Sequence, residues 1–328
     1  MHCAPKNFNK SMTQERINTT QAWKRLFNTD WPGVCGEPHL FNSPWMPQSP
    51  LPLWPDRGPF GSDKKTLYHA IKMRSISKSP PALPYLEPHD PFPDVSAAWG
   101  PESPAPGLLA AGADLSLERL VDAYSHGIFP WFSPGEPILW WSTEPRMVLH
   151  TEHLKLQRSM LKTLKRFTRQ SGCEIKFDTH FEGVISACAG VSRARQGGTW
   201  ITPEMVQAYT RLHQAGLAHS VETWVQGELV GGLYCVALGR AVFGESMFSL
   251  ASDASKIALF ALVAFCRDQG IELIDCQQQT PHLESLGAQP MARQDFLVKA
   301  QHAMRLGSPS WDYKPIYWQK IHPSLSPT

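Results

Sequence analysis

The chain has 328 residues, 42% of them hydrophobic and 18% charged, and its 31 Lys and Arg residues against 29 Asp and Glu residues give a formal net charge of +2. This composition excludes a disordered or fibrous protein, and the length allows two domains with a sizeable core. The small net charge excludes a general polycation, so any contact with nucleic acid must come from a local basic patch.

The seven cysteines are widely spaced without a CxxC pair, which favours reduced thiols over a disulfide framework or a zinc site. The longest uninterrupted apolar stretch, residues 257–265, is far shorter than the roughly 20 residues that span a bilayer. The N-terminal residues lack the apolar core of a secretory signal. We therefore expect a cytoplasmic protein without a membrane anchor.

The first third of the chain is rich in proline and has no sustained apolar periodicity, since 18 of the 29 prolines precede Leu108. We predict a mostly irregular N-terminal extension over residues 1–80, with Met73 as an alternative start of the protein. A small N-terminal domain is predicted over residues 81–150 and a larger domain over residues 151–328.

A helix is predicted directly after Ser116, a good N-cap residue, because apolar side chains keep helical spacing up to Tyr124. Gly127 stands where a C′ glycine would end this helix. The following run, GIFPWFSPGEPILWWSTEPR over residues 127–146, holds five aromatic residues and four prolines. Proline removes a backbone donor and fixes φ, so the run predicts a stiff irregular loop rather than a helix or a central strand.

The aromatic residues of this loop have two interpretations. Stacked on nucleobases, each would contribute about 1 to 3 kcal/mol of binding free energy. They could equally form a small aromatic core beneath the loop. The sequence leaves both open for Trp131, Trp140 and Trp141.

A second helix is predicted over residues 153–169, and its charge is one-sided. Between Lys155 and Arg169 there are six basic residues and no acidic one, whereas a merely solvated face usually mixes signs. The pattern favours phosphate binding over a soluble basic face.

From Thr202 the pattern becomes regular. Thr202 and Pro203 predict a helix start, and Gly216 its end. Strands are predicted over residues 219–225, 229–238 and 241–243, followed by a helix over 252–268 and a buried strand over 271–276. This strand, helix and strand crossover on a partly antiparallel sheet predicts an α+β fold.

Polar clusters follow two strands of this crossover, at residues 244–249 and 275–277. Asp275 and Gln277 are two positions apart, so they are expected on the same side of their strand. A carboxylate beside an amide can orient the amide oxygen toward an amine that loses a proton as it attacks. The alternative is a strand-end aspartate that caps a neighbouring helix.

In combination, these segments resemble the bacterial leucyl/phenylalanyl-tRNA-protein transferases. The matching blocks occur in order and span roughly residues 74–320. They are GIFPWF (127–132), WWS with EPR (140–146), GTWIT (198–202), HSVETW (219–224), GGLY (231–234), GESMFS (244–249), ASK (254–256), LIDCQ (273–277) and HLESLGA (282–288).

The resemblance implies a leucyltransferase-type aminoacyltransferase. Such an enzyme transfers leucine or phenylalanine, and methionine less well, from Leu-tRNA or Phe-tRNA to proteins with an N-terminal Arg or Lys. These proteins then enter N-end rule degradation. The resemblance also implies a small N-terminal α/β domain, a GNAT-like acyltransferase domain with a mixed sheet, a monomeric protein, and neither metal nor cofactor.

The resemblance further implies roles for individual residues. Asp275 and Gln277 match the pair assigned to peptide-bond formation, and Glu245 matches another carboxylate of the site. Trp131 matches the tryptophan that stacks on adenine, and Trp200 matches a second tryptophan at the site. The acyl side-chain pocket maps to Leu233, Val242, Met247, Leu259, Leu262 and Ile274, and the tRNA-binding helix to Arg158, Lys162, Lys165 and Arg166.

The chain departs from the family pattern at four positions. Leu233 and Val242 stand where some relatives carry Met and Phe, Cys235 replaces a usual glycine, and Thr143 replaces a proline. The apolar replacements alter side-chain volume, so the order of preference among Leu, Phe and Met is left open.

Two other functions compete with this one. A GNAT-like sheet could instead use acyl-CoA, but the chain has no Q/R-x-x-G-x-G/A pyrophosphate loop, and residues 277–281 read QQQTP. A tRNA-binding module without enzymatic activity would use the aromatic loop and the basic helix alone, and it leaves Asp275 and Gln277 unexplained.

Overall fold

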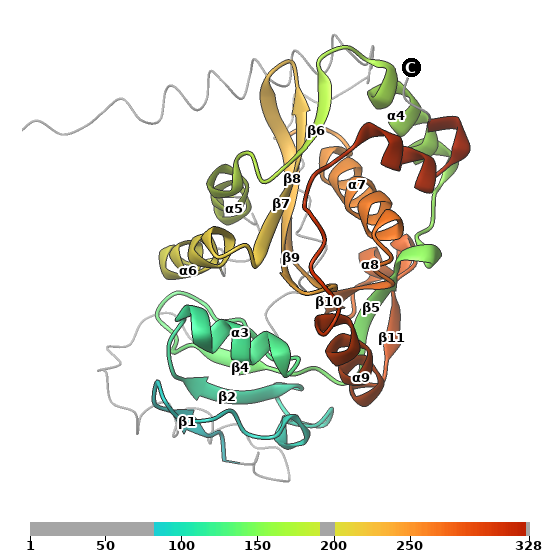
Figure 1. The fold of residues 1–328 in the computed structure, drawn as a ribbon. Helices are drawn as coiled ribbons and strands as arrows, with labels where there is room; N and C mark the ends of the chain where they lie inside the picture. The colour runs from blue at the N-terminus through green and yellow to red at the C-terminus, as the bar shows by residue number, and fades with distance from the viewer. Residues whose placement is uncertain (1–81, 191–200, 326–328) are drawn as a thin grey trace, which may run out of the picture.

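The computed structural model describes residues 82–190 and 201–325, and this part of the chain contains two β-sheets (Figure 1). The predicted N-terminal extension, residues 1–80, lies outside the described residues. The first sheet has four strands in the order β1-β2-β4-β3, and the second has seven in the order β11-β5-β10-β9-β8-β7-β6. The change of sheet falls between Trp141 and Arg146, while the division into domains stays a proposal.

The four-stranded sheet contains β1 (Tyr85–Leu86), β2 (Leu108–Gly112), β3 (Phe129–Pro130) and β4 (Leu139–Trp141). The prediction of an irregular loop over residues 127–146 is therefore wrong for β3 and β4, which pair with each other, and β4 also pairs with β2. The prolines permit this because they avoid the interior strand: Pro130 lies on the edge strand β3, and the others lie in the turn or beyond β4.

The helix predicted after Ser116 is α3 (Leu117–Ser125), and the prediction of its ends is confirmed. The Ser116 side chain accepts a hydrogen bond from the N–H of Arg119, and Gly127 has φ of +68°. The basic helix α4 (Arg158–Arg169) begins five residues later than predicted. The N–H of Lys155 instead donates to the carbonyl of Leu286 at 2.9 Å, so the chain is bonded there to another segment.

The larger sheet is built around a three-stranded antiparallel meander. Its strands are β7 (Ala218–Val225), β8 (Glu228–Leu238) and β9 (Ala241–Ser249). Gln226 and Gly227 both have positive φ, as a two-residue hairpin turn requires. Strand β9 continues to Ser249, so the expected third strand, residues 241–243, was too short, and the polar cluster 244–249 belongs to the strand.

The predicted crossover is confirmed. Helix α7 (Ala254–Asp268) connects β9 to β10 (Leu273–Gln277), and the two strands pair in parallel. Strands β5 (Arg146–His150) and β11 (Gln289–Met291) continue the sheet beyond β10, while β6 (Cys173–Phe177) pairs with β7 at the opposite edge. Parallel and antiparallel pairs in one sheet, together with helices, make the fold α+β with a mixed sheet, as expected.

Helices cover both faces of the larger sheet (Figure 1). Helices α4 and α7, together with α8 (Pro281–Leu286), share one apolar core with the sheet. The other core contains side chains of α3, α5 (Phe181–Gly190), α6 (Pro203–Gln214) and α9 (Arg293–Met304), and it continues into the four-stranded sheet. Over the described ranges, no helix combines the length and apolarity needed to cross a membrane.

Candidate active site

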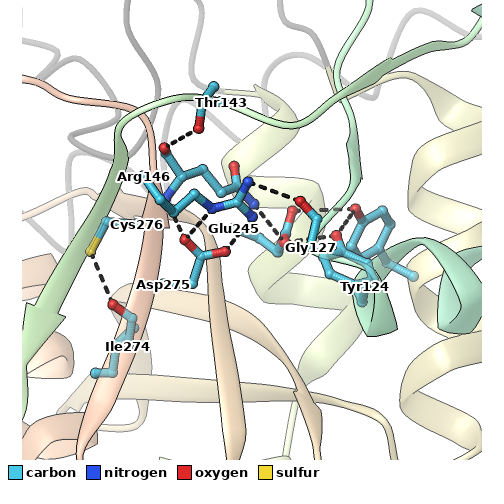
Figure 2. Close-up of polar contacts among 10 residues, drawn as sticks. Tyr124, Gly127, Thr143, Arg146, Glu245, Ile274, Asp275 and Cys276 are labelled. Atoms are coloured by element: carbon cyan, nitrogen blue, oxygen red, sulfur yellow. Dashed lines mark hydrogen bonds and ion pairs between the residues drawn. The ribbon is translucent and has the colours of Figure 1, made fainter. Parts of the chain in front are cut away.

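The structure brings together the three side chains that the resemblance assigns to catalysis, and two of them, Asp275 and Glu245, are labelled in Figure 2. Asp275 and Gln277 lie at the carboxyl end of β10, and Glu245 lies on the neighbouring parallel strand β9. The side-chain Nε2 of Gln277 donates a hydrogen bond of 3.1 Å to Oε1 of Glu245. Each of the three residues is at most 1% exposed, so their polar atoms depend on protein partners.

Asp275 forms a bidentate ion pair with Arg146 of β5. Nε of Arg146 donates to Oδ1 of Asp275 at 2.8 Å, and Nη2 donates to Oδ2 at 2.6 Å. A third nitrogen, Nη1, donates to the carbonyl of Gly127 at 3.0 Å. The guanidinium also packs on the rings of Phe129 and Phe296, whose centroids lie 4.9 and 4.8 Å away. This arrangement satisfies a buried charge with both an opposite charge and hydrogen bonds.

Gln277 has an unusual backbone. Its φ is +61°, and the pairing between β10 and β5 is irregular between Asp275 and Gln277. The N–H of Gln277 donates to Oδ1 of Asp275 at 2.8 Å, and its carbonyl accepts from Oγ1 of Thr143 at 2.8 Å. Oε1 of its side chain is buried and has no hydrogen-bond partner among the described residues.

These contacts correct one expectation about the site. Asp275 was expected to orient the side-chain amide of Gln277, but it holds the main-chain N–H of that residue. The side-chain amide is held by Glu245. The irregularity in β10 accounts for the difference, because the simple alternation of side chains fails where the register shifts.

Glu245 lies among tyrosine hydroxyls. Tyr124 of α3 donates to Oε1 of Glu245 at 2.7 Å, Tyr209 of α6 donates to Oε2 at 3.2 Å, and the two hydroxyl oxygens are 2.5 Å apart. Glu245 is also the extra residue where the pairing of β8 with β9 shifts, since Tyr234 pairs with Ser246 and Cys235 with Gly244.

Burial is the main cause of an unusual protonation equilibrium at Glu245. It raises the pKa of this carboxyl from 4.5 to about 8, and the nearby charge of Asp275 also raises it. Hydrogen bonds from Tyr124 and Tyr209 and the charge of Arg146 act in the opposite direction. Burial likewise raises the pKa of both tyrosines well above 10, so these hydroxyls keep their protons.

The six residues assigned to the acyl side-chain pocket also lie together, all at most 4% exposed and in the apolar core that α7 shares with the sheet. They come from β8, β9, β10 and α7: Leu233, Val242, Met247, Ile274, Leu259 and Leu262. The polar side chains lie on the other face of the sheet, because the partners of Glu245 and the rings beside Arg146 belong to the second core.

Of the two tryptophans that the resemblance places at the site, only Trp131 lies within the described residues. Trp131 is 6% exposed, and its ring is tilted against Trp141 with centroids 5.2 Å apart. Its carbonyl accepts a hydrogen bond of 2.7 Å from Nε1 of Trp141. Since Trp140 and Trp141 are also buried, the aromatic core is the interpretation that the structure supports for these two. Trp200 lies outside the described residues.

The basic helix α4 is placed apart from the carboxylates. It packs through Met160, Leu164 and Phe167 and lies next to β6, at the edge of the sheet opposite β5 and β11 (Figure 1). Its four assigned basic residues face outward, three of them exposed and Lys165 half-buried. They are Arg158, Lys162, Lys165 and Arg166.

Three polar residues of the site were not predicted from the sequence. Arg146 was noted only as part of a motif, Tyr124 was interpreted as an apolar position of an amphipathic helix, and Tyr209 lies inside the predicted helix that starts after Thr202. The sequence signal was an arginine directly after a proline and directly before the apolar run 147–149. The tyrosine spacing fits both a packed ring and a polar partner, so the sequence could not distinguish them.

Metal chemistry was not expected from the sequence. In the ranges 82–190 and 201–325, no group of three or more His, Cys, Asp or Glu side chains is placed to hold a metal ion. The His219 ring contacts Asp178 at 2.7 Å and stacks on Trp311 with centroids 3.8 Å apart.

Comparison with known proteins identifies relatives along both sheets. Residues 148–301 match the model of the leucyl/phenylalanyl-tRNA protein transferase family, and residues 113–144 match the model of that family's N-terminal domain. A GCN5-related N-acetyltransferase from Kribbella flavida aligns over 52% of this chain and 60% of its own, with 14% identity and a TM-score of 0.26. The GNAT-like architecture therefore stays a prediction.

Three curated relatives share more than half of the aligned residues, and each is named leucyl/phenylalanyl-tRNA--protein transferase. The relative from Polaromonas sp. strain JS666 is 58% identical over 253 residues, which cover 77% of this chain and 99% of the relative. Relatives from Albidiferax ferrireducens and Burkholderia vietnamiensis are 56% and 54% identical, covering 75% and 72% of this chain and 97% and 91% of their own lengths. The chain therefore belongs to the leucyl/phenylalanyl-tRNA protein transferase family and is an aminoacyltransferase.

Proposed function

We propose that this protein transfers leucine or phenylalanine, and methionine less well, from aminoacyl-tRNA to the N-terminal Arg or Lys of acceptor proteins. The products would enter N-end rule degradation, and the enzyme would act as a monomer in the cytoplasm. The curated relatives carry the name of this activity. The acceptor rule and the degradation pathway rest on the family resemblance.

The observation that supports the proposed chemistry is the hydrogen bonding of the Gln277 side chain. Glu245 holds its Nε2, while its buried Oε1 has no hydrogen-bond partner in the described part of the chain. An amide oxygen held in this way is ready to accept a hydrogen bond from an attacking amine. Leaving such an acceptor unpaired is costly, and this cost is removed when a substrate N–H arrives.

The reaction itself needs little more than positioning. The aminoacyl ester on tRNA is already activated, and an α-amino group has a pKa of about 8, so it is a fair nucleophile once neutral. The amine nitrogen forms a bond to the ester carbonyl carbon, the bond from that carbon to the ribose oxygen breaks, and the amine proton passes to the ribose oxygen. In this scheme Gln277 orients the amine, while Glu245 and Asp275 hold the side chain and the main chain of Gln277.

Selection of the amino acid is assigned to the apolar side chains around α7. The six pocket residues offer aliphatic and thioether surfaces, and their side chains contribute no strong hydrogen-bond donor or acceptor. Such a pocket separates substrates that differ by one methylene by only about 1 to 3 kcal/mol, so transfer of methionine is expected as a side reaction.

Binding of tRNA is assigned to the outward face of α4, with stacking of the terminal adenine on Trp131. The exposure of Arg158, Lys162 and Arg166 supports the first assignment, since phosphate contacts need accessible cations. Trp131 is buried against Trp141, so stacking would require this side chain to become more exposed when tRNA binds.

The test is transfer of labelled leucine from leucyl-tRNA to a peptide that begins with arginine, beside a peptide that begins with glutamate. Transfer to the arginine peptide alone is the expected result. Gln277→Met should abolish most of this transfer, because it keeps side-chain length and removes the amide. Gln301→Met, the same change at an exposed position of α9, is the matched control and should transfer normally.

Other outcomes would point to the competing functions. Tight binding of deacylated tRNA without any transfer would favour a binding module. Retention on a CoA resin, or a thermal shift with acetyl-CoA, would favour an acyl-CoA enzyme. Wild-type transfer by Gln277→Met would remove the role assigned to the Gln277 amide.

A further inference from the structure

The peptide at Gln277 is held in a conformation that side-chain-bearing residues rarely adopt. Its φ is +61°, and the N–H of Gln278 donates to the carbonyl of Cys276 at 2.7 Å, which closes a tight turn centred on Gln277. A three-residue turn with positive φ is rare and strained. Conformations of this kind persist only where surrounding groups hold them in place.

Two polar side chains bind the backbone of Gln277, one at its N–H and one at its carbonyl. Oδ1 of Asp275 accepts from its N–H, and Oγ1 of Thr143 donates to its carbonyl, each at 2.8 Å. The contact to Asp275 is local, because that residue lies two positions earlier on the same strand. Thr143 approaches from the segment between the two sheets (Figure 2), so it is the long-range support.

The segment that carries Thr143 is itself fixed on both sides. The N–H of Ser142 donates to the carbonyl of Gly107 at 2.8 Å in the four-stranded sheet. On the side of the larger sheet, Nη1 of Arg293 donates to the carbonyl of Ser142 at 2.8 Å, and the Arg293 N–H donates to Oε2 of Glu144 at 3.0 Å. A hydroxyl mounted on such a segment is pre-positioned, since little freedom is left to lose when it bonds.

We propose that Thr143 is a positioning residue for aminoacyl transfer: its hydroxyl fixes the Gln277 peptide so that the side-chain amide reaches Glu245 and presents Oε1 to the amine. The inference rests on the proposed function. It extends that function because it assigns a role to a residue that does not itself touch the reacting atoms.

The test compares two substitutions at Thr143 in the full-length protein. Thr143→Val keeps the branched shape and removes the donor, whereas Thr143→Ser keeps the hydroxyl. Loss of one neutral hydrogen bond that is needed for alignment predicts a kcat about tenfold lower for Thr143→Val, with the KM for leucyl-tRNA changed by less than about twofold. Thr143→Ser should retain most of the wild-type kcat.

The matched control is Thr151→Val. Thr151 is also buried, and its hydroxyl donates to the carbonyl of Ile271 at 3.1 Å, just before the other end of β10. A general effect of losing a buried hydroxyl would lower kcat equally in both valine variants. The positioning role predicts a loss in Thr143→Val alone.

Three results would overturn the inference: wild-type kcat in Thr143→Val, an equal loss in Thr143→Ser, or an equal loss in Thr151→Val. If the wild-type protein transfers no leucine, the proposed function fails instead. A crystal structure of Thr143→Val then decides the inference separately. A displaced Gln277 peptide supports it, and an unchanged peptide with the same contact between Gln277 and Glu245 overturns it.

Discussion

Replacing Glu245 with glutamine tests whether this buried carboxyl couples the stability of the protein to pH. Glutamine copies the protonated acid and can keep its contacts. Its oxygen can accept from Tyr124 and Gln277, as Oε1 of Glu245 does, and its NH2 group can donate to the Tyr209 hydroxyl. The substitution therefore removes the titration and retains most of the packing.

The direction in which stability changes with pH follows from the raised pKa of Glu245. Between the ordinary value of 4.5 and the folded value of about 8, the folded protein holds a proton that the unfolded chain releases. The free energy of unfolding of the wild-type protein therefore falls as pH rises through this window. The free energy of unfolding changes by about 1.4 kcal/mol for each pH unit, so across the whole window it falls by about 5 kcal/mol.

The assay is urea unfolding of both proteins at five pH values from 5 to 9, because the difference between them isolates Glu245 from other titrating groups. We expect nearly equal stabilities at pH 5 and a growing advantage of Glu245→Gln up to pH 8 to 9. Glu182→Gln, at an exposed position of α5, should show a constant difference from wild type. A constant difference for Glu245→Gln as well would refute the raised pKa.

Three further predictions use the same structure. Arg146→Met should lower the free energy of unfolding by about 3 to 5 kcal/mol in urea, because it leaves Asp275 as an unpaired buried charge, and adding Asp275→Asn should recover part of this loss. Tyr124→Phe removes a hydrogen bond that lowers the pKa of Glu245, so the pH at which stability levels off should move upward; an unchanged or lower pH would contradict this. Lys162→Gln with Arg166→Gln should weaken tRNA binding and reduce the slope of log K against log salt by about 1 to 2, whereas Lys299→Gln on α9 should leave that slope unchanged.

Local signals predicted much of the fold. The ends of α3 and α6 were predictable because Ser116 and Thr202 are capping residues whose side chains accept from the third following N–H. The hairpin between β7 and β8 was predictable from the turn residues Gln226 and Gly227. The crossover was predictable because a long apolar helix, α7, lies between two predicted strands. The helix caps and the hairpin turn depend on neighbours within a few residues, and such short-range effects are readable from sequence.

Interactions between distant segments set the parts that were missed. Strand β4 was not predicted because the prolines on either side of it suggested a loop. None of these prolines lies within β4 itself. Within the range predicted as helix, the N–H of Lys155 is bonded to the carbonyl of Leu286, more than 100 residues away along the chain. Neither local propensity nor periodicity carries information about such a partner.

The candidate site was likewise predicted only in part from the sequence. The family motifs identified Asp275, Gln277 and Glu245 as a group, but they did not give the contacts within it. Both strands are irregular at this point, after Asp275 in β10 and at Glu245 in β9. An extra residue reverses the alternation of the side chains that follow, so a two-residue spacing alone could not say which carboxylate holds the Gln277 amide.

The two carboxylates have different surroundings, and this difference explains how each contributes to the site. Asp275 is paired with the guanidinium of Arg146 and holds a main-chain N–H. Glu245 has a pKa of about 8, so at neutral pH it is mostly protonated, and its Oε1 still accepts from Gln277. The surroundings of the unpaired Gln277 oxygen are then close to electrically neutral. Such surroundings favour a neutral amine over an ammonium ion, because burial penalises the charged form. We therefore expect the acceptor amine to lose its proton as it enters the site, before it attacks the ester.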